Sequence, residues 1–313
     1  CRISYVDEYY RTYLIESILT AIEEFDLDGV QLDFLRFGYV GNGWSKREEE
    51  IYASFGVRVE ELRKELIASY DPSKPQNNLG SFLERLKEGE TQISLFSRAR
   101  SSIIRDFAKD ITDSVHRAFP FMEVSLAMMP EEFYPDWKGI SSLHYGQDLE
   151  NLKAVVDRLF PMAYAGVYNM GSDWTAAICT DAVRSAPGFV LGLDCIEPRG
   201  ALHIKSDLQA VRNLTDAGIC LFRYGRMILA EQNGNETVLL NTYAGTVNRL
   251  ILVNGDETIT MEVEILEAGS MCIHGQWELI RAFGSFASGA NRKYEGELCV
   301  VQSQDLSEWG CIE

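Results

Sequence analysis

The stretch that is most informative about the fold is DGVQLDFLRF, residues 28–37. Five of its residues are apolar, and an Asp-Gly pair precedes them at the end of a helical segment. This pattern is typical of a buried inner strand of a parallel α/β sheet, and it predicts a strand over residues 30–37. Asp33 and Arg36 then lie near the carboxyl end of that strand. Because (β/α) barrels place their chemistry at that end, the segment is the first candidate for an active site.

The composition limits the classes of partner. The chain has 313 residues, 46% of them hydrophobic, and a formal net charge of −18, so it can bury a full core but lacks the excess of Lys and Arg that a nucleic-acid site needs. No stretch reaches the roughly 18 consecutive apolar residues of a membrane span, and the start lacks a signal-peptide pattern. We expect a soluble protein with neutral or cationic ligands, cytoplasmic by default, or secreted if a signal peptide lies upstream of residue 1. The sequence gives no indication of oligomeric state.

Cysteine and histidine usage indicates neither a metal nor a cofactor. The seven cysteines are scattered without a Cys-x-x-Cys pair, and the four histidines are too dispersed for a metal site or a Ser-His-Asp set. Cys195 and Cys220 fall in strand-like runs and are interpreted as buried thiols. The glycines at 41 and 43 lack the rest of a dinucleotide fingerprint. Cys1 indicates either an incomplete chain or a lipidated cysteine, and Arg2 after it favours the fragment.

Strands and amphipathic helices alternate along the first three quarters of the chain. The predicted strands cover 30–37, 122–127, 156–163, 189–193 and 218–224, and the predicted helices cover 9–25, 58–70, 97–119, 146–152, 172–185 and 203–217. Such alternation predicts an α/β fold with a parallel sheet. Five βα units would form the carboxyl-terminal portion of a (β/α)8 TIM barrel, or an open five-stranded sheet. The helix at 9–25 has no strand before it, which favours the barrel portion, so we assign residues 1–232 to it.

The pattern changes beyond about residue 233. Runs of β-branched and apolar residues at 247–253, 258–266, 271–273 and 298–302 are separated by turn signals, of which Asn254-Gly255 is the strongest. These runs predict a small all-β, sandwich-like domain over residues 233–313.

Polar residues follow the predicted strands in a way that suits glycosidic cleavage. These residues are Asp33, Arg36, Glu131, Glu132, Tyr164, Asp194, Arg223 and Tyr224. If the sheet is parallel, they share one rim. Glycoside hydrolysis requires two carboxyl groups, one as proton donor and one as nucleophile or base. We assign Asp33 as the nucleophile or base, and either Glu131 or Glu132 as the proton donor.

The remaining rim residues are candidates for binding substrate. Arg36, Tyr164, Asp194, Arg223 and Tyr224 could hydrogen-bond sugar hydroxyls. Loop aromatics could stack on sugar rings, namely Trp44 and Trp137 together with Tyr134, Tyr168 and Trp174. A structural interpretation stands beside this one. In it, Asp33 only caps the strand or pairs with Arg36, and Glu131 and Glu132 are solvated loop residues.

The segment from ISY at 3–5 through YRTY at 10–13 to DGVQLDFLR at 28–36 resembles the family-10-like glycosyl hydrolase domain of many bacterial proteins. VSLA at 124–127 and PMAY at 161–164 look like its next two strands, so the similarity covers roughly residues 3 to 228. The resemblance implies a TIM barrel that acts on glycosides and begins here near its third βα unit. By position it implies Asp33 as the safest site residue, followed by Arg36 and Tyr164.

A second resemblance is to chitinase-type barrels, which carry Asp-Gly-x-Asp-x-Asp-x-Glu on the equivalent strand. Asp33 and the Met-x-Tyr at 162–164 fit that pattern, but Gln31 replaces the middle Asp and Leu35 replaces the proton-donating Glu. The substrate-assisted mechanism of those enzymes would therefore lack its acid. We expect a glycoside hydrolase that cleaves O-glycosidic bonds of a poly- or oligosaccharide by paired carboxylates. The alternative is an inactive carbohydrate-binding or scaffolding barrel.

Overall fold

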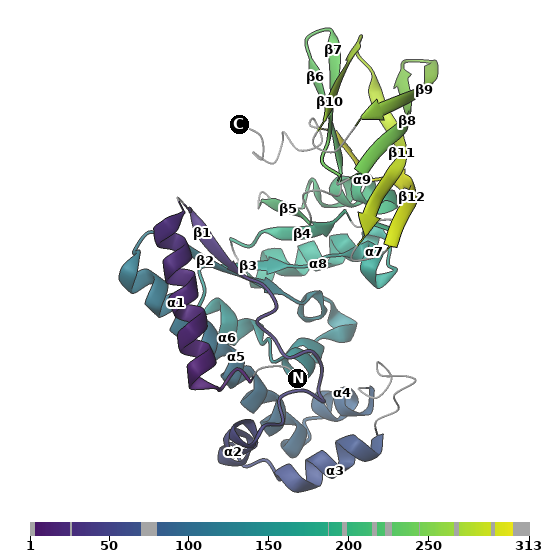
Figure 1. Cartoon of the computed structure of the whole chain (residues 1–313). Coiled ribbons are helices and arrows are strands. Elements are labelled where there is room, and N and C mark those ends of the chain that lie inside the picture. The colour runs from purple at the N-terminus through teal and green to yellow at the C-terminus, as the bar shows by residue number, and fades with distance from the viewer. Residues whose placement is uncertain are drawn as a thin grey trace. The chain divides into compact units, whose positions relative to one another are not determined.

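The structure is a computed structural model that describes residues 4–25, 27–69, 80–186, 188–195, 199–214, 218–222, 227–243, 245–265, 269–288 and 292–302. It divides into two compact units, Cys1–Pro161 and Met162–Glu313 (Figure 1). This division does not coincide with the domain boundary expected at residue 233, which stays a prediction.

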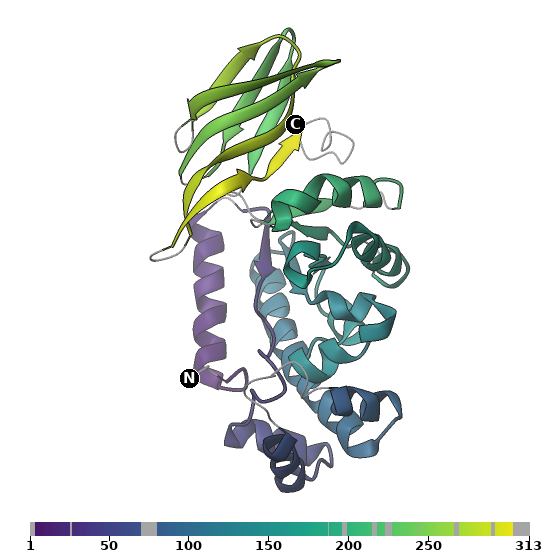
Figure 2. The ribbon, with the colours of Figure 1, turned by 90° about the vertical axis from the view of Figure 1, so that its right-hand side faces the viewer.

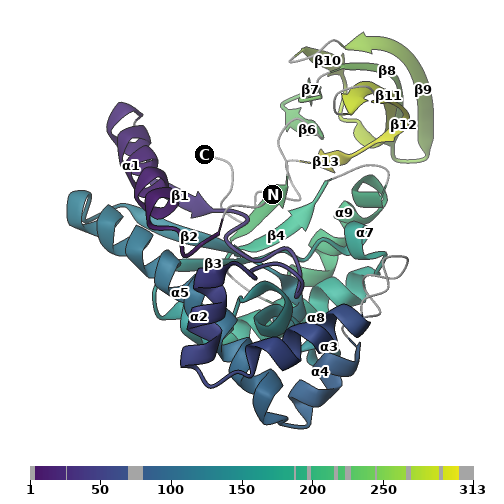
Figure 3. The same ribbon diagram turned by 60° about the horizontal axis from the view of Figure 1, so that its bottom comes forward.

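The first unit is built on a three-stranded parallel sheet. Its strands are β1 (Gly29–Leu32), β2 (Glu123–Met128) and β3 (Arg158–Pro161), in the order β1-β2-β3 (Figure 3). Leu32 lies opposite Leu126. Because the strands are parallel, their carboxyl ends lie at the same edge of the sheet. The segments that follow β1 and β2 therefore both begin at that edge.

Helices make up the rest of the first unit. They are α1 (Glu8–Glu24), α2 (Lys46–Ser54), α3 (Val59–Ser69), α4 (Gly80–Lys87), α5 (Thr91–Ala118), α6 (Leu149–Lys153), and the short η2 (Pro130–Phe133), η3 (Pro135–Trp137) and η4 (Ser141–Tyr145). The helices predicted at 9–25, 58–70 and 97–119 correspond to α1, α3 and α5. Helix α5 is the main packing element, because its apolar stripe is buried along most of its length. Helix α1 packs against it, with the Arg11 guanidinium 5.0 Å from the ring centre of Phe107.

The expectation of a buried inner strand over residues 30–37 is wrong in two respects. Strand β1 ends at Leu32, because Phe34 takes a left-handed backbone conformation with φ of +58° that no strand can continue through. Within the described part of the chain, β1 is also the edge strand of its sheet. Of its residues only Leu32 is buried, whereas Gln31 is exposed.

The second unit begins with an α/β part. Strands β4 (Leu191–Asp194) and β5 (Ile219–Phe222) pair in parallel, and Met162 forms a parallel bridge with Gly192. The helices are α7 (Ala165–Tyr168), α8 (Ser172–Ser185) and α9 (Arg199–Val211). Helix α8 is as predicted, while α9 starts and ends earlier than the predicted 203–217. No closed barrel is formed by the described residues, so a mixed α/β architecture is the level at which the predicted fold class is confirmed.

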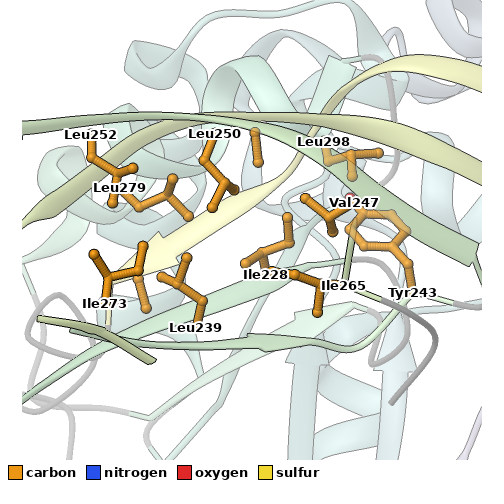
Figure 4. Packing of buried hydrophobic residues seen from close by; sticks show 12 residues of the cluster. Ile228, Leu239, Tyr243, Val247, Leu250, Leu252, Ile265, Ile273, Leu279 and Leu298 are labelled. Atoms are coloured by element: carbon orange, nitrogen blue, oxygen red, sulfur yellow. The ribbon is translucent and has the colours of Figure 1, made fainter. Parts of the chain in front are cut away.

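The second unit continues as an all-β sandwich, as predicted. Its strands are β6 (Ile228–Asn233), β7 (Glu236–Asn241), β8 (Gly245–Asn254), β9 (Glu257–Ile265), β10 (Ser270–His274), β11 (Glu278–Ser288), β12 (Arg292–Leu298) and β13 (Val300–Gln302). They form two four-stranded sheets, ordered β10-β7-β6-β13 and β12-β11-β8-β9 (Figure 2). Apolar side chains of both sheets, among them Leu239, Leu250 and Leu279, make one buried core (Figure 4).

The turn at Asn254-Gly255 joins β8 to β9, with Gly255 at φ of +60°, as its sequence signal predicts. Strands β6, β7, β11 and β12 are not predicted by the sequence pattern. In β11 the reason is Gly284, which interrupts the run of side chains. A Cβ atom there would lie 2.1 Å from the carbonyl oxygen of Thr246 on β8, so the close approach of the two strands requires glycine.

Two expectations about whole-chain properties can be compared with the described residues. None of the helices in these ranges has both the length and the apolar character needed to cross a bilayer. Cys195 is buried as expected, but Cys220 is only partly buried and Cys272 is exposed.

Candidate functional site

Asp33 and Arg36 lie in the segment that follows β1, whereas the sequence pattern predicts them inside the last part of a longer strand. Arg36 Nη1 is 3.9 Å from Asp33 Oδ1, with 15% and 45% of the two side chains exposed. This is a loose ion pair, longer than a hydrogen bond. Asp33 Oδ1 also accepts the backbone N–H of Phe34 at 2.7 Å. Asp33 is therefore oriented by its neighbours but remains accessible to a ligand.

Phe34, between these two residues, has the strained backbone noted above and is 66% exposed. The hydroxyl of Tyr5 lies 2.9 Å from the Phe34 carbonyl oxygen and 2.8 Å from the Arg36 carbonyl oxygen. The Arg36 guanidinium lies 4.5 Å from the centre of the Phe34 ring. The segment is thus held by contacts from both sequence neighbours and the amino-terminal region.

Glu131 and Glu132 lie in η2, directly after β2, and are only 5% and 9% exposed. The interpretation of these two residues as solvated loop residues is therefore wrong. The Tyr145 hydroxyl donates to Glu131 Oε1 at 3.2 Å. The pKa of Tyr145 is raised well above its usual value, first by burial and then by the negative charge of Glu131.

The backbone directly after Arg36 contacts the segment that carries Tyr145. The positive charge of Arg36 acts on Tyr145 in the direction opposite to Glu131, and the Phe37 N–H donates to the Tyr145 carbonyl oxygen at 2.9 Å. Asp33 is thus paired with Arg36, Tyr145 is hydrogen-bonded to Glu131, and a backbone hydrogen bond joins the two segments. We call these four side chains of the first unit the rim cluster. Its two carboxylates follow two neighbouring parallel strands.

Gln147 joins the backbone of the two segments that carry the rim cluster. Its side chain, 0% exposed, donates to the carbonyl oxygens of Leu35 at 3.3 Å and Ala127 at 3.0 Å, and accepts from the Met129 N–H at 2.9 Å. One buried amide thus satisfies groups from both segments, and this fixes their spacing.

Arg100 of α5 supports the loop that continues from the rim cluster. It is 0% exposed and donates to the carbonyl oxygens of Asn42, Tyr39 and His144 at 2.7, 3.1 and 2.9 Å. Its guanidinium also lies 4.1 Å from the ring centre of Phe37. Burial, followed by the charge of Arg100, lowers the pKa of His144 to about 3. The imidazole is thus neutral near pH 7, and its Nδ1 accepts the Val40 N–H at 3.3 Å.

Sequence reasoning missed Tyr145, Gln147 and Arg100. A signal existed only for Arg100, because it occupies the apolar stripe of α5 one turn before Ile103 and Ile104, where a charged residue needs a buried partner. Tyr145 and Gln147 lie on either side of Gly146. The helix predicted over 146–152 is wrong at its start, because Gly146 has a left-handed φ of +73° and α6 begins only at Leu149.

The aromatic residues expected to bind sugar differ in their surroundings. Trp174 is 2% exposed inside α8, so the expectation of an exposed loop aromatic is wrong for this residue. Trp44 is half-buried and stacks on Phe96 with ring centres 5.3 Å apart. Trp137 is half-buried and packs edge-on against Tyr134 at 5.0 Å. Sugar binding by Trp44 and Trp137 stays a prediction.

In the second unit, Asp194 ends β4 and is 1% exposed. Its pKa is raised to about 6, mainly by burial and further by the charge of Asp207, against the Gly166 amide and His203, which lower it. Asp207 on α9 is 0% exposed, and its Oδ1 accepts the Thr175 hydroxyl at 3.1 Å. Burial also raises the pKa of Asp207, so both carboxyl groups hold their protons to a higher pH than a solvated aspartate does.

Tyr164 is half-buried at the start of α7, and its ring stacks on Phe222, with centres 5.4 Å apart. The other two predicted rim residues, Arg223 and Tyr224, lie outside the described residues. As for metals, no group of three or more His, Cys, Asp or Glu side chains in the described ranges could hold an ion. The rim cluster instead offers two carboxyl groups, a guanidinium and a phenol.

Comparisons with known proteins give little further information. No family model matches the chain, and no curated protein matches it. Two solved structures of Bacteroides uniformis beta-glucuronidase match at 7% identity. For beta-glucuronidase 2 bound to cyclophellitol-6-carboxylate aziridine, the match covers 70% of this chain and 33% of that chain with a TM-score of 0.29. For the second structure, of Bacteroides uniformis beta-glucuronidase, the match covers 69% of this chain and 33% of that chain with a TM-score of 0.31. The chain spans about a third of the length of these proteins.

Proposed function

We propose that this protein is a glycoside hydrolase of the (β/α)-barrel type, which cleaves O-glycosidic bonds of an oligo- or polysaccharide. The observation that carries the proposal is that Asp33, paired with Arg36, and Glu131, hydrogen-bonded to Tyr145, follow two neighbouring parallel strands. Glycosidic cleavage needs two carboxyl groups that face one bond, and parallel strands bring their carboxyl-terminal residues to one edge.

Each member of the rim cluster then has a role. Asp33 acts as the nucleophile or base, because it is accessible and Arg36 stabilises its charge. Glu131 protonates the departing glycosidic oxygen. The Tyr145 hydroxyl donates to the Glu131 carboxylate that remains after the proton has left, and so favours the transfer. Glu132 is the second candidate for proton donor, because it lies in the same η2 turn.

A carbohydrate-binding protein without turnover is the second candidate function. The ion pair between Asp33 and Arg36 favours it, since a carboxylate held by a guanidinium is a weaker nucleophile. Its length of 3.9 Å and the 45% exposure of Asp33 leave the carboxylate open to a substrate. We therefore place hydrolysis first.

The first prediction concerns Asp33. We expect D33N to lower kcat of the full chain by at least about 100-fold on any glycan that the wild-type protein hydrolyses, because the amide cannot act as nucleophile or base. D28N is the matched control, because Asp28 is exposed at the opposite end of β1 and belongs to no part of the rim cluster. Reducing-sugar release from a glycan panel measures both.

The proton donor is assigned in the same assay with E131Q and E132Q. The variant that lacks the donor should lose turnover of natural glycosides but retain it on a dinitrophenyl glycoside, whose leaving group departs without protonation. Equal activity of D33N and the wild-type protein would contradict the proposed mechanism. Glycan binding without turnover by the wild-type protein would favour the second candidate function.

A further inference from the structure

Phe34 has a backbone conformation that aromatic residues avoid. Its φ of +58° lies in the left-handed region, where the Cβ atom crowds the following carbonyl and where glycine and asparagine are the usual residues. Among the non-glycine residues that the structure describes, only Asn169 shares a positive φ. Strain of this kind persists only where surrounding contacts enforce it, and it gathers at functional sites.

Three contacts around Phe34 enforce this conformation. Its N–H donates to Asp33 Oδ1, its carbonyl oxygen accepts the Arg36 N–H at 2.7 Å, and the same oxygen lies 2.9 Å from the Tyr5 hydroxyl. Tyr5 is in turn fixed by an edge-on contact with Phe37, with ring centres 5.7 Å apart. The contacts come from the polar site residues themselves and from a distant part of the chain.

The effect of the strain is to expose the Phe34 ring. In an extended strand Leu32 and Phe34 would point to the same face, so the ring would be buried beside Leu32. The left-handed turn instead buries Leu35 and Phe37, which are 5% and 3% exposed, and leaves Phe34 66% exposed. The Phe34 side chain is therefore exposed beside the rim cluster instead of being buried in the core.

The ring lies among polar groups suited to a sugar. The Arg36 guanidinium lies 4.5 Å from the ring centre, and 15% of its side chain is exposed, although its Nη1 atom is itself buried. Asp33, with its half-exposed carboxylate, directly precedes Phe34. A pyranose has an apolar face of C–H groups and a periphery of hydroxyls, so it matches an aromatic ring flanked by a carboxylate and a guanidinium.

We propose that Phe34 is the stacking platform for a neutral pyranose ring of the substrate, with Asp33 and Arg36 as hydrogen-bonding partners of its hydroxyls. The inference rests on the proposed function and adds the residue that selects the substrate class. Phe34 is a binding residue here and takes no part in bond cleavage. The net charge of −18 makes a neutral sugar a better ligand than an acidic one.

The test measures binding in the E131Q background, which removes the first candidate proton donor. Isothermal titration with cellohexaose, xylohexaose, maltohexaose and chitohexaose is carried out for E131Q alone and for E131Q combined with F34N, F34W or F121N. F34N removes the ring but keeps a residue that tolerates positive φ, so the fold is retained. Phe121 is fully exposed in the same unit and provides the matched control.

We expect E131Q to bind at least one of the four sugars. Adding F34N should weaken that binding by at least about tenfold, because one aromatic contact is lost. F34W should keep the affinity within about threefold, and F121N should leave it unchanged. Equal affinities of F34N and its parent would overturn the platform, as would the absence of binding to all four sugars by the parent. Urea denaturation checks that F34N is folded.

Failure of this inference can be distinguished from failure of the proposed function. If wild-type turnover is lost in D33N while F34N leaves KM unchanged, the hydrolase stands and the platform is wrong. If the wild-type protein has no turnover but F34N weakens binding, the platform stands and the hydrolytic mechanism is wrong.

Discussion

Asp33 and Asp194 are the same kind of residue at the same kind of place, the carboxyl end of a parallel strand, yet their surroundings differ. Asp33 is about half exposed and faces a guanidinium. Asp194 is 1% exposed and faces a second carboxyl group, Asp207, with the partly compensating His203 on the same helix. Water and a cation stabilise the charge on Asp33, whereas burial and a like charge oppose the charge on Asp194. Their chemistry therefore differs although their sequence context does not.

The environment of Asp194 predicts a pH-dependent stability. Its pKa is about 6 in the folded protein, above the unfolded value of 3.8. A carboxyl group with a raised pKa contributes stability that is fully present below pH 3.8 and is lost as the pH rises through 6. Removing the titrating group with D194N should therefore raise the free energy of unfolding at pH 8 by about 2–3 kcal/mol relative to its effect near pH 4.

Urea denaturation of wild-type protein and D194N across pH 4 to 8 measures this difference. D181N is a suitable control, because Asp181 lies on α8, outside the set of groups that shift the pKa of Asp194. A shift of the urea midpoint by D194N that is the same at every pH would contradict the explanation.

At the scale of elements, the short segment from η4 to α6 positions the rim cluster. Helix η4 ends at Tyr145, and Gly146 then turns the chain with φ of +73°. This turn directs Tyr145 to Glu131 and Gln147 to the segments after β1 and β2. A Cβ atom on Gly146 would lie 2.8 Å from Ile104 and 3.0 Å from the Arg100 carbonyl oxygen, so the turn is also closely packed.

The turn gives a prediction for G146A. The added methyl group requires a strained φ and also overlaps the backbone of α5. Gly89 provides the matched control, because its φ of +78° is similar but no atom lies within 4 Å of its Cβ position. We expect G146A to lower the free energy of unfolding by about 1–3 kcal/mol more than G89A does. Because both substitutions share the strained φ, this difference is the cost of overpacking alone.

Chemical denaturation of both variants tests this expectation, and turnover on a glycan provides a second readout. G146A should lower turnover because it displaces Tyr145, whereas G89A should not. Equal stability of the two variants would show that the atoms around Gly146 can move to accept a methyl group without loss of stability.

At the scale of the whole molecule, the two compact units differ in architecture. The first is a parallel sheet with helices, and the second combines an α/β part with the sandwich. The sandwich has a core of its own, made by residues from both of its sheets. Helix α9 of the same unit is tied to it by an ion pair, with Lys205 Nζ 2.7 Å from Glu278 Oε1.

The sandwich core predicts the effect of truncating its leucines. Leu250 on β8 is 0% exposed, whereas Leu240 on β7 is 36% exposed. L250A should lower the free energy of unfolding by about 2–5 kcal/mol, because it leaves a cavity between the sheets, and L240A should change it by less than about 1 kcal/mol. Calorimetric or urea unfolding measures both. Similar losses in the two variants would show that the core is not packed as described.

The order and kind of most helices and strands can be predicted from local sequence patterns. Helix and strand periodicity are local properties, which is why the five parallel strands, α1, α5, α8 and the all-β character of the carboxyl-terminal part are predictable. The same local pattern predicts Asp33 and Arg36 near the carboxyl end of the first strand, although β1 ends before both of them. The ends of elements were less predictable, as the early end of β1 at Leu32 shows.

Which polar groups contact each other, and which are buried, depends on the packing of distant segments. Gln147 reaches Leu35 across 112 positions of sequence, and Arg100 reaches Tyr39 across 61. The left-handed turn at Phe34 depends on a hydroxyl supplied by Tyr5. Burial and electrostatic interaction are set by neighbours in space, and no local pattern encodes them. For this reason the sequence pattern places Asp33 near a strand end. The hydrogen bond between Tyr145 and Glu131 and the exposure of Phe34 depend on the packed fold.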